Sequence, residues 1–168
     1  MSDLIPIKTL LVNQCGVVLK SITDLASVYV NPSAWSVVEG LDKPLGIVWD
    51  LDESPTYINM ARKSKLLVQF DIYLKSSDGS YDNSKKFYTS QQSIDLDSIH
   101  AKLNAAMLDI RNPMHTYCQL IEEIAVSKNM GYDDFSVLVN QYQITYITQR
   151  GNPYQVYKIG RASCRERV

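Results

Sequence analysis

The stretch from residue 65 to residue 75 constrains the fold more than any other part of the chain, because apolar side chains occupy every second position in it. This alternation is typical of a strand with one face on a hydrophobic core and the other toward solvent. We expect a strand over residues 66–74. Its core-facing side chains are Leu66, Val68, Phe70, Ile72 and Leu74. The alternate positions, which are mostly polar, should be mostly exposed.

Two other segments carry apolar side chains at the spacing of a helix. The first covers residues 4–22. The second begins near Asp95, where Asp95 and Asp97 would favour the first turn through the helix dipole, and it ends at Asn112 and Pro113. Its apolar face consists of Leu96, Ile99, Leu103, Met107 and Ile110.

The remaining segments are mainly extended. Strands are predicted within residues 28–30, 35–38, 44–50, 57–60, 136–148 and 154–157. Residues 114–128 fit either a helix or a strand, and we favour the helix. The polar residues 76–93 are either a mobile or contacting loop or a loose hairpin. This order predicts an α+β fold, with a largely antiparallel sheet of about four to six strands and two or three α-helices packed on one face.

The last ten residues, 159–168, are not expected to belong to the protein. Translated back into codons, they give a sequencing-library adapter in frame, and such a tail is excluded from fold reasoning. We therefore expect one globular domain over residues 1–158, truncated at its C-terminus, followed by a non-native tail. Because the tail contains three arginines and one glutamate, its removal changes the formal net charge from −1 to −3.

Charge and cysteine content argue against several classes of protein. An acidic chain is a poor sequence-specific nucleic-acid binder, and the basic groups at residues 62–65 and 85–86 are interpreted as solvated turns. Cys15 and Cys118 have no CxxC spacing, so buried free thiols are expected and no metal or cofactor. No apolar run approaches the ~20 residues of a membrane span, and the N-terminus lacks a secretory signal.

Residues 47–54 (IVWDLDES) resemble the first motif of the haloacid-dehalogenase superfamily. The resemblance implies a magnesium-dependent phosphatase in which Asp50 is the nucleophile and Asp52 the acid/base. In that family, however, this strand comes first in a doubly wound fold and a helix or cap follows it. Here a helix precedes the motif and further strands follow, so an enzyme is not expected and the phosphatase remains an alternative.

The arrangement of the whole chain resembles the tail terminator (tail completion, minor tail protein U-like) proteins of long-tailed bacteriophages. The segments that carry the resemblance are residues 7–19, 44–50, 66–74, 99–110 and 143–148 (QITYIT). The chain departs from the family pattern at residues 31–39, at residues 76–93 and beyond residue 150. Another small virion or interaction domain of the same α+β type is a third interpretation.

The resemblance implies a structural protein without a cofactor. Such subunits form a six-membered ring on the head-proximal end of the tail tube, where they stop tube growth and join tail to head. The expected partners are other copies of the chain, the tail tube protein and the head–tail connector, in the virion and, during assembly, in the host cytoplasm. Side chains suited to such contacts are Leu67, Tyr73, Phe87 and Tyr88.

Overall fold

A computed structural model describes residues 4–32, 44–75, 80–82, 84, 86–130 and 135–157. Its helices are α1 (Ile7–Lys20), α3 (Gln91–Leu108) and the short 3-10 helix η1 (Pro113–Thr116). Its strands are β1 (Ser27–Val30), β2 (Leu45–Ile58), β3 (Ala61–Lys75), β4 (Ser80–Asp82), β5 (Phe87–Thr89), β6 (Leu120–Asn129), β7 (Phe135–Gln149) and β8 (Asn152–Val156).

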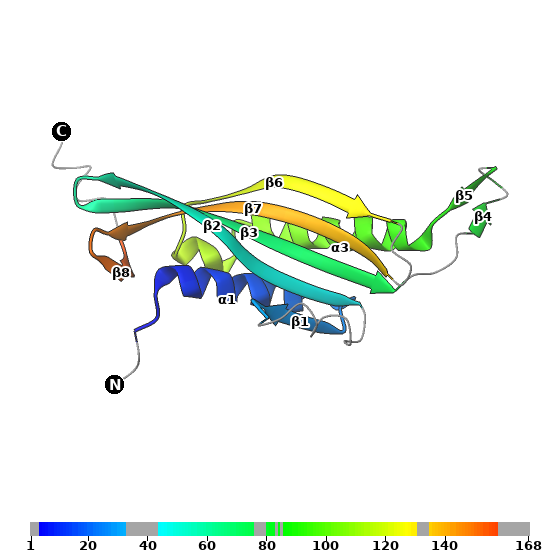
Figure 1. Ribbon diagram of the computed structural model, residues 1–168, viewed down its shortest axis with the longest axis horizontal. Coiled ribbons are helices and arrows are strands. Elements are labelled where there is room, and N and C mark those ends of the chain that lie inside the picture. Colours follow the sequence, from blue (N-terminus) through cyan, green and yellow to red (C-terminus); the bar gives the residue numbers. More distant parts are fainter. Residues whose placement is uncertain are drawn as a thin grey trace.

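The sheet confirms the predicted α+β class. Within the described ranges it has six strands in the order β1-β2-β3-β7-β6, with β8 also paired to β7. Only the β1–β2 pair is parallel; the other described pairs are antiparallel. Helices α1 and α3 lie on one face of this long, twisted sheet, and β4 and β5 form a separate hairpin (Figure 1).

The main core lies between the helices and the face of the sheet that they cover. The prediction for residues 66–74 is confirmed, because Leu66, Val68, Phe70 and Ile72 are fully buried and Leu74 is nearly so. Helix α1 contributes Leu11, Cys15 and Leu19 to the same cluster. Full burial of one leucine, isoleucine, valine or phenylalanine side chain stabilises the folded state by about 1.5–3 kcal/mol.

The outer face of the sheet, which points away from the helices, is less exposed than predicted. Asp71 and Tyr73 are only 6% and 2% exposed, because Tyr73 joins a second apolar cluster with Leu45, Ile47 and Val137. The Asp71 carboxylate accepts hydrogen bonds from Trp49 Nε1 at 3.0 Å and from Gln69 Nε2 at 2.8 Å. These bonds offset part of the cost of burying the carboxylate, and burial still raises its pKa.

The prediction of a helix at residues 114–128 is wrong. Asn112 Oδ1 accepts a hydrogen bond from Met114 N and starts η1, after which the chain enters β6. This strand is the last in the sheet order, and Ile121 is its only buried residue. Because β6 lies at the sheet edge and is exposed on both faces, the core does not impose on this segment the strong alternation that would distinguish a strand from a helix.

Three smaller boundaries differ from the predictions. The second helix begins at Gln91, where the Ser90 side chain caps it by accepting from Ser93 N, so Asp95 and Asp97 lie beyond its first turn. It ends at Leu108, which leaves Ile110 90% exposed. Residues 57–60 are not a separate strand: β2 continues to Ile58, and a two-residue turn with Asn59 at φ 53° leads into β3.

Several predictions fall on residues that are not described. The extended piece at 35–38, the tail at 159–168, and positions 76–79, 83 and 85 of the polar segment lie outside the described residues. The described part of the polar segment forms the β4–β5 hairpin and the start of α3. Within the described ranges, no helix is both long and apolar enough to span a bilayer.

Candidate interaction surfaces

The aspartates of the phosphatase-like motif do not converge. In a regular strand Asp50 and Asp52 would share a face, but a β-bulge between them pairs Asp50 with Val68 and Asp52 with Leu67. Neighbouring positions of β3 point to opposite faces, so the two carboxylates do as well. Strand β2 then continues as a hairpin with β3 instead of ending before a helix. This geometry disfavours a nucleophile and an acid/base acting on one phosphate.

The bulge instead brings Asp50 and Glu53 to the helix-covered face, near the start of α1. Lys8 Nζ lies 3.5 Å from Asp50 Oδ2 and 3.6 Å from Glu53 Oε2. Arg62 Nη1 donates to Glu53 Oε1 at 2.9 Å, and the Tyr146 hydroxyl also donates to that oxygen. These groups pair with one another, which suits a clamp that fastens α1 to the sheet.

The electrostatics of this cluster follow from its hydrogen bonds. Partial burial raises the pKa of Glu53, but the hydrogen bonds from Tyr146 and Arg62 outweigh burial and hold the pKa below its usual value. Burial and the neighbouring Glu53 raise the pKa of Tyr146 to about 12. Among the residues that the structure covers, no group of three or more His, Cys, Asp or Glu side chains could hold a metal ion.

Exposed apolar side chains gather at the end of the sheet formed by the β2–β3 turn. We call this the sheet-end surface: Tyr57, Ile58, Met60 and Arg150. Tyr57, Ile58 and Met60 are 54%, 57% and 60% exposed. The Arg150 guanidinium lies 5.3 Å from the centre of the Tyr57 ring, in a cation–π contact. Residues 62–65, predicted to be a solvated turn, are part of β3.

A second group of exposed apolar side chains follows β6. We call this the edge surface: Leu120, Glu122, Ile124, Val126 and Met130. Its apolar members are 40–50% exposed. A second bulge, between Glu123 and Ala125, makes Ile124 the unpaired residue of the strand. In the described ranges no strand pairs with the outer side of β6, so its backbone groups there remain open to a partner.

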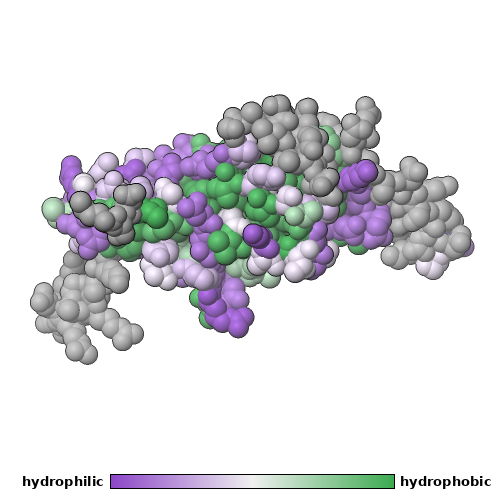
Figure 2. All heavy atoms as spheres, turned by 90° about the horizontal axis from the view of Figure 1, so that it is seen from below, coloured by the Kyte–Doolittle hydropathy of each residue, from purple (hydrophilic) through white to green (hydrophobic). Residues whose placement is uncertain are grey.

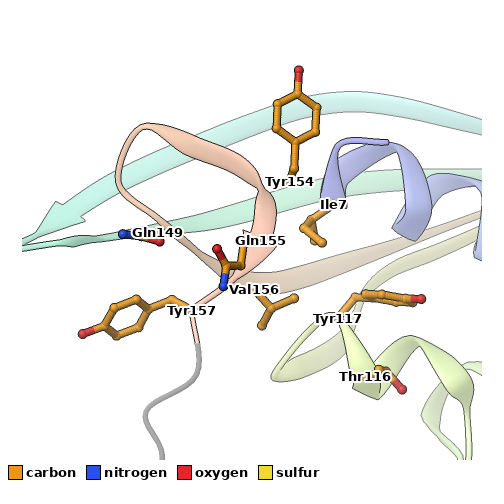
Figure 3. A pocket seen from close by; sticks show the side chains of 8 residues that line it. All are labelled: Ile7, Thr116, Tyr117, Gln149, Tyr154, Gln155, Val156 and Tyr157. Atoms are coloured by element: carbon orange, nitrogen blue, oxygen red, sulfur yellow. The ribbon is translucent and has the colours of Figure 1, made fainter. Parts of the chain in front are cut away.

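A groove of about 580 Å³ lies between the start of α1, η1 and β8 (Figure 3). It is lined by Ile7, Thr116, Tyr117, Gln149, Tyr154, Gln155, Val156 and Tyr157. None of these side chains is a carboxylate, histidine or lysine, so the three tyrosine hydroxyls are the groups in the groove that could exchange a proton. From below, hydrophobic residues also reach the surface between hydrophilic ones (Figure 2).

Of the residues proposed from the sequence for interfaces, Leu67 and Tyr73 have described side chains, and neither is fully exposed. Leu67 lies half-buried on the outer face, whereas Tyr73 belongs to the second apolar cluster. Phe87 and Tyr88 lie in β5, and their side chains are outside the described part of the structure. Sequence reasoning missed the apolar residues at the β2–β3 turn, although Tyr57, Ile58 and Met60 in one short segment were the available signal.

No protein-family model matches the sequence, and no curated protein matches it. The functional conclusion therefore rests on the chemistry of these surfaces.

Proposed function

We propose that the protein is a structural subunit that assembles into a closed ring, as tail terminators do on the head-proximal end of a phage tail tube. The observation that carries the proposal is the presence of two separate groups of exposed apolar side chains, on the sheet-end surface and on the edge surface. Clustered apolar residues at a protein surface favour association. Two unlike surfaces that bind each other give a heterologous contact, which closes into a ring when the rotation allows it.

The polar groups favour this role over catalysis. The two motif aspartates lie on opposite faces of β2. The charged side chains beside them, Lys8, Glu53 and Arg62, form ion pairs with one another. A ring subunit needs neither a reactive carboxylate nor a cofactor, so these contacts require no further role.

In the proposed role the ring binds the end of the tube built from the tail tube protein. It stops further growth there and offers its other side to the head–tail connector. The third interpretation, another small interaction domain, shares the same surfaces but does not bind a tube end.

Tube growth tests the proposal. Tail tube protein of a long-tailed phage would be polymerised with and without the purified protein, and tube lengths and ends would be examined by electron microscopy. We expect shorter tubes with a ring at one end. Tubes of unchanged length, with no bound protein, would contradict the proposal.

A further inference from the structure

We infer that the outer face of the sheet binds the same face of a second copy of the chain, through a small patch on β3 and β6. We call this the outer patch: Lys65, Leu67, Leu120 and Glu122. Lys65 of β3 and Leu120 of β6 pair with the same residue of β7. Leu67 and Glu122 both pair with the residue two positions earlier. All four side chains therefore point to the outer face, at the corners of a rectangle of about 7 by 10 Å.

The outer patch is open to solvent, and its charges are not used within the chain. Helices α1 and α3 lie on the opposite face of the sheet (Figure 1). Lys65 and Glu122 are exposed, Leu120 is 48% exposed, and Leu67 is half-buried. Neither Lys65 nor Glu122 forms an ion pair with any described residue. Both charges are thus open to partners from another molecule, beside two leucines that gain from burial.

The arrangement of the four side chains is self-complementary. Lys65 and Glu122 occupy one diagonal of the rectangle, and Leu67 and Leu120 occupy the other. Two sheets that face each other are related by a two-fold axis in the plane of the contact. An axis along the leucine diagonal brings Lys65 of each copy to Glu122 of the other. It also sets each leucine against its own counterpart, so the contact has an apolar centre between two ion pairs.

The signs of the charges disfavour the other two-fold arrangements of this patch. An axis along the charged diagonal would place Lys65 on Lys65 and Glu122 on Glu122. Axes along or across the strands would place each charge on a leucine, which removes water from the charge without supplying a partner. Charge complementarity therefore selects a second copy in one orientation as the occupant of the outer patch.

This contact goes beyond the proposed ring and does not depend on it. Val126 of the edge surface pairs with Asn140, which in turn pairs with the core residue Phe70, so Val126 lies on the helix-covered face. Occupation of the outer patch therefore leaves this part of the edge surface available. Copies that use both kinds of contact would form two rings joined across two-fold axes.

Cross-linking of a single introduced thiol tests the two-fold geometry. A position on the two-fold axis meets itself in the partner copy, which a head-to-tail contact does not bring about. Leu120→Cys in a Cys164→Ser background should therefore give a covalent dimer with a short bis-maleimide, since Cys15 and Cys118 are buried. Lys75→Cys, exposed on the same face but at the other end of β3, is the matched control and should cross-link at least tenfold more slowly.

Charge reversal tests the orientation of the contact. Lys65→Glu and Glu122→Lys should each raise the concentration of half-association, measured by sedimentation velocity at low ionic strength, by about tenfold. Each reversal turns both ion pairs of the contact into repulsions. An equimolar mixture of the two variants should regain most of the association, because each pair then joins opposite charges again. The double variant should do the same, and Lys75→Glu should associate like the wild type.

The outcomes separate this contact from the ring. Thermal unfolding would establish that each variant is folded. The contact would be overturned if Leu120→Cys cross-linked no faster than Lys75→Cys, or if both reversals associated like the wild type. It would also be overturned if the single reversals lost association and the mixture did not regain it. Dimers that cross-link through Leu120→Cys but never close into a ring would support the outer patch and contradict the proposed function.

Discussion

At the scale of single residues, Glu53 illustrates how one carboxylate joins distant parts of the chain. It contacts α1 through Lys8, β3 through Arg62 and β7 through Tyr146. We expect Glu53→Gln to destabilise the fold by about 1–3 kcal/mol, because a partly buried arginine loses its counter-charge. Denaturant unfolding at neutral pH would measure this. Asp52→Asn, on the same strand but exposed, should change stability by less than about 0.5 kcal/mol.

The contribution of Glu53 should also depend on pH. Its folded-state pKa is lowered from 4.5, so its stabilising effect is present above that value and is lost as pH falls through the folded pKa. The stability difference between wild type and Glu53→Gln should therefore shrink on acidification. Burial raises the pKa of Asp71, so this residue affects stability in the opposite direction as pH falls. Asp71 is present in both proteins, so its effect cancels from the difference between them. A difference that grows as pH falls would contradict the assignment.

Asp50 provides the residue-scale test of the enzyme alternative. Because its partner in the motif lies on the other face of β2, we expect no magnesium-dependent hydrolysis of an aryl phosphate. The Asp50→Asn variant should likewise show no turnover. Clear wild-type activity that disappears in the variant would restore the phosphatase interpretation.

At the scale of elements, the close approach of α1 to β1 depends on a glycine. A Cβ atom at Gly16 would meet Val30 Cγ2 at 2.6 Å. Overpacking of this kind costs about 1–3 kcal/mol, whereas alanine improves helix propensity over glycine by about 1 kcal/mol. We therefore expect Gly16→Ala to lower the free energy of unfolding by about 1 kcal/mol. Asn13→Ala, at an exposed site of α1, should be neutral or stabilising, and equal gains in both variants would contradict this packing.

The elements with one buried face could be predicted from the sequence. Strands β3 and β7 repeat apolar residues at every second position, and helix α1 repeats them at helical spacing. Each pattern arises because one face of the element packs against the core. The segment of strand β6 fitted a helix and a strand equally, since a strand exposed at the sheet edge is under no such selection. The start of α3 was misplaced because Ser90, not an aspartate, caps it.

The candidate surfaces were harder to predict than the fold. Tyr73 had the features of an exposed contact residue when β3 was considered alone, but Leu45, Ile47 and Val137 from neighbouring strands bury it. The spacing of Asp50 and Asp52 suggested one site, and the bulge that separates them left no mark in the sequence. Pairing with neighbouring strands determines both the burial of Tyr73 and the separation of the two aspartates. The residue pattern of a single segment does not specify that pairing.

At the scale of the whole molecule, the distribution of charge predicts how assembly depends on salt. Exposed charges such as Lys65 and Glu122 lie beside the apolar side chains of β6, so opposite charges of neighbouring copies attract one another across a solvent-exposed rim. Raising the ionic strength from about 0.05 M to about 0.5 M should weaken assembly, because screening shortens the reach of exposed charges. Sedimentation velocity at several salt concentrations would measure this. Assembly strengthened by salt would indicate a contact that is apolar throughout.

The mass of the assembled species tests the central claim most directly. Native mass spectrometry of the purified chain over a range of concentrations, alone and with tail tube, would give the number of copies in each complex. A closed ring of unlike contacts predicts one species above the dimer, with a mass that stops increasing at high concentration. A chain that stays monomeric in both conditions, or that stops at a dimer, would contradict the account.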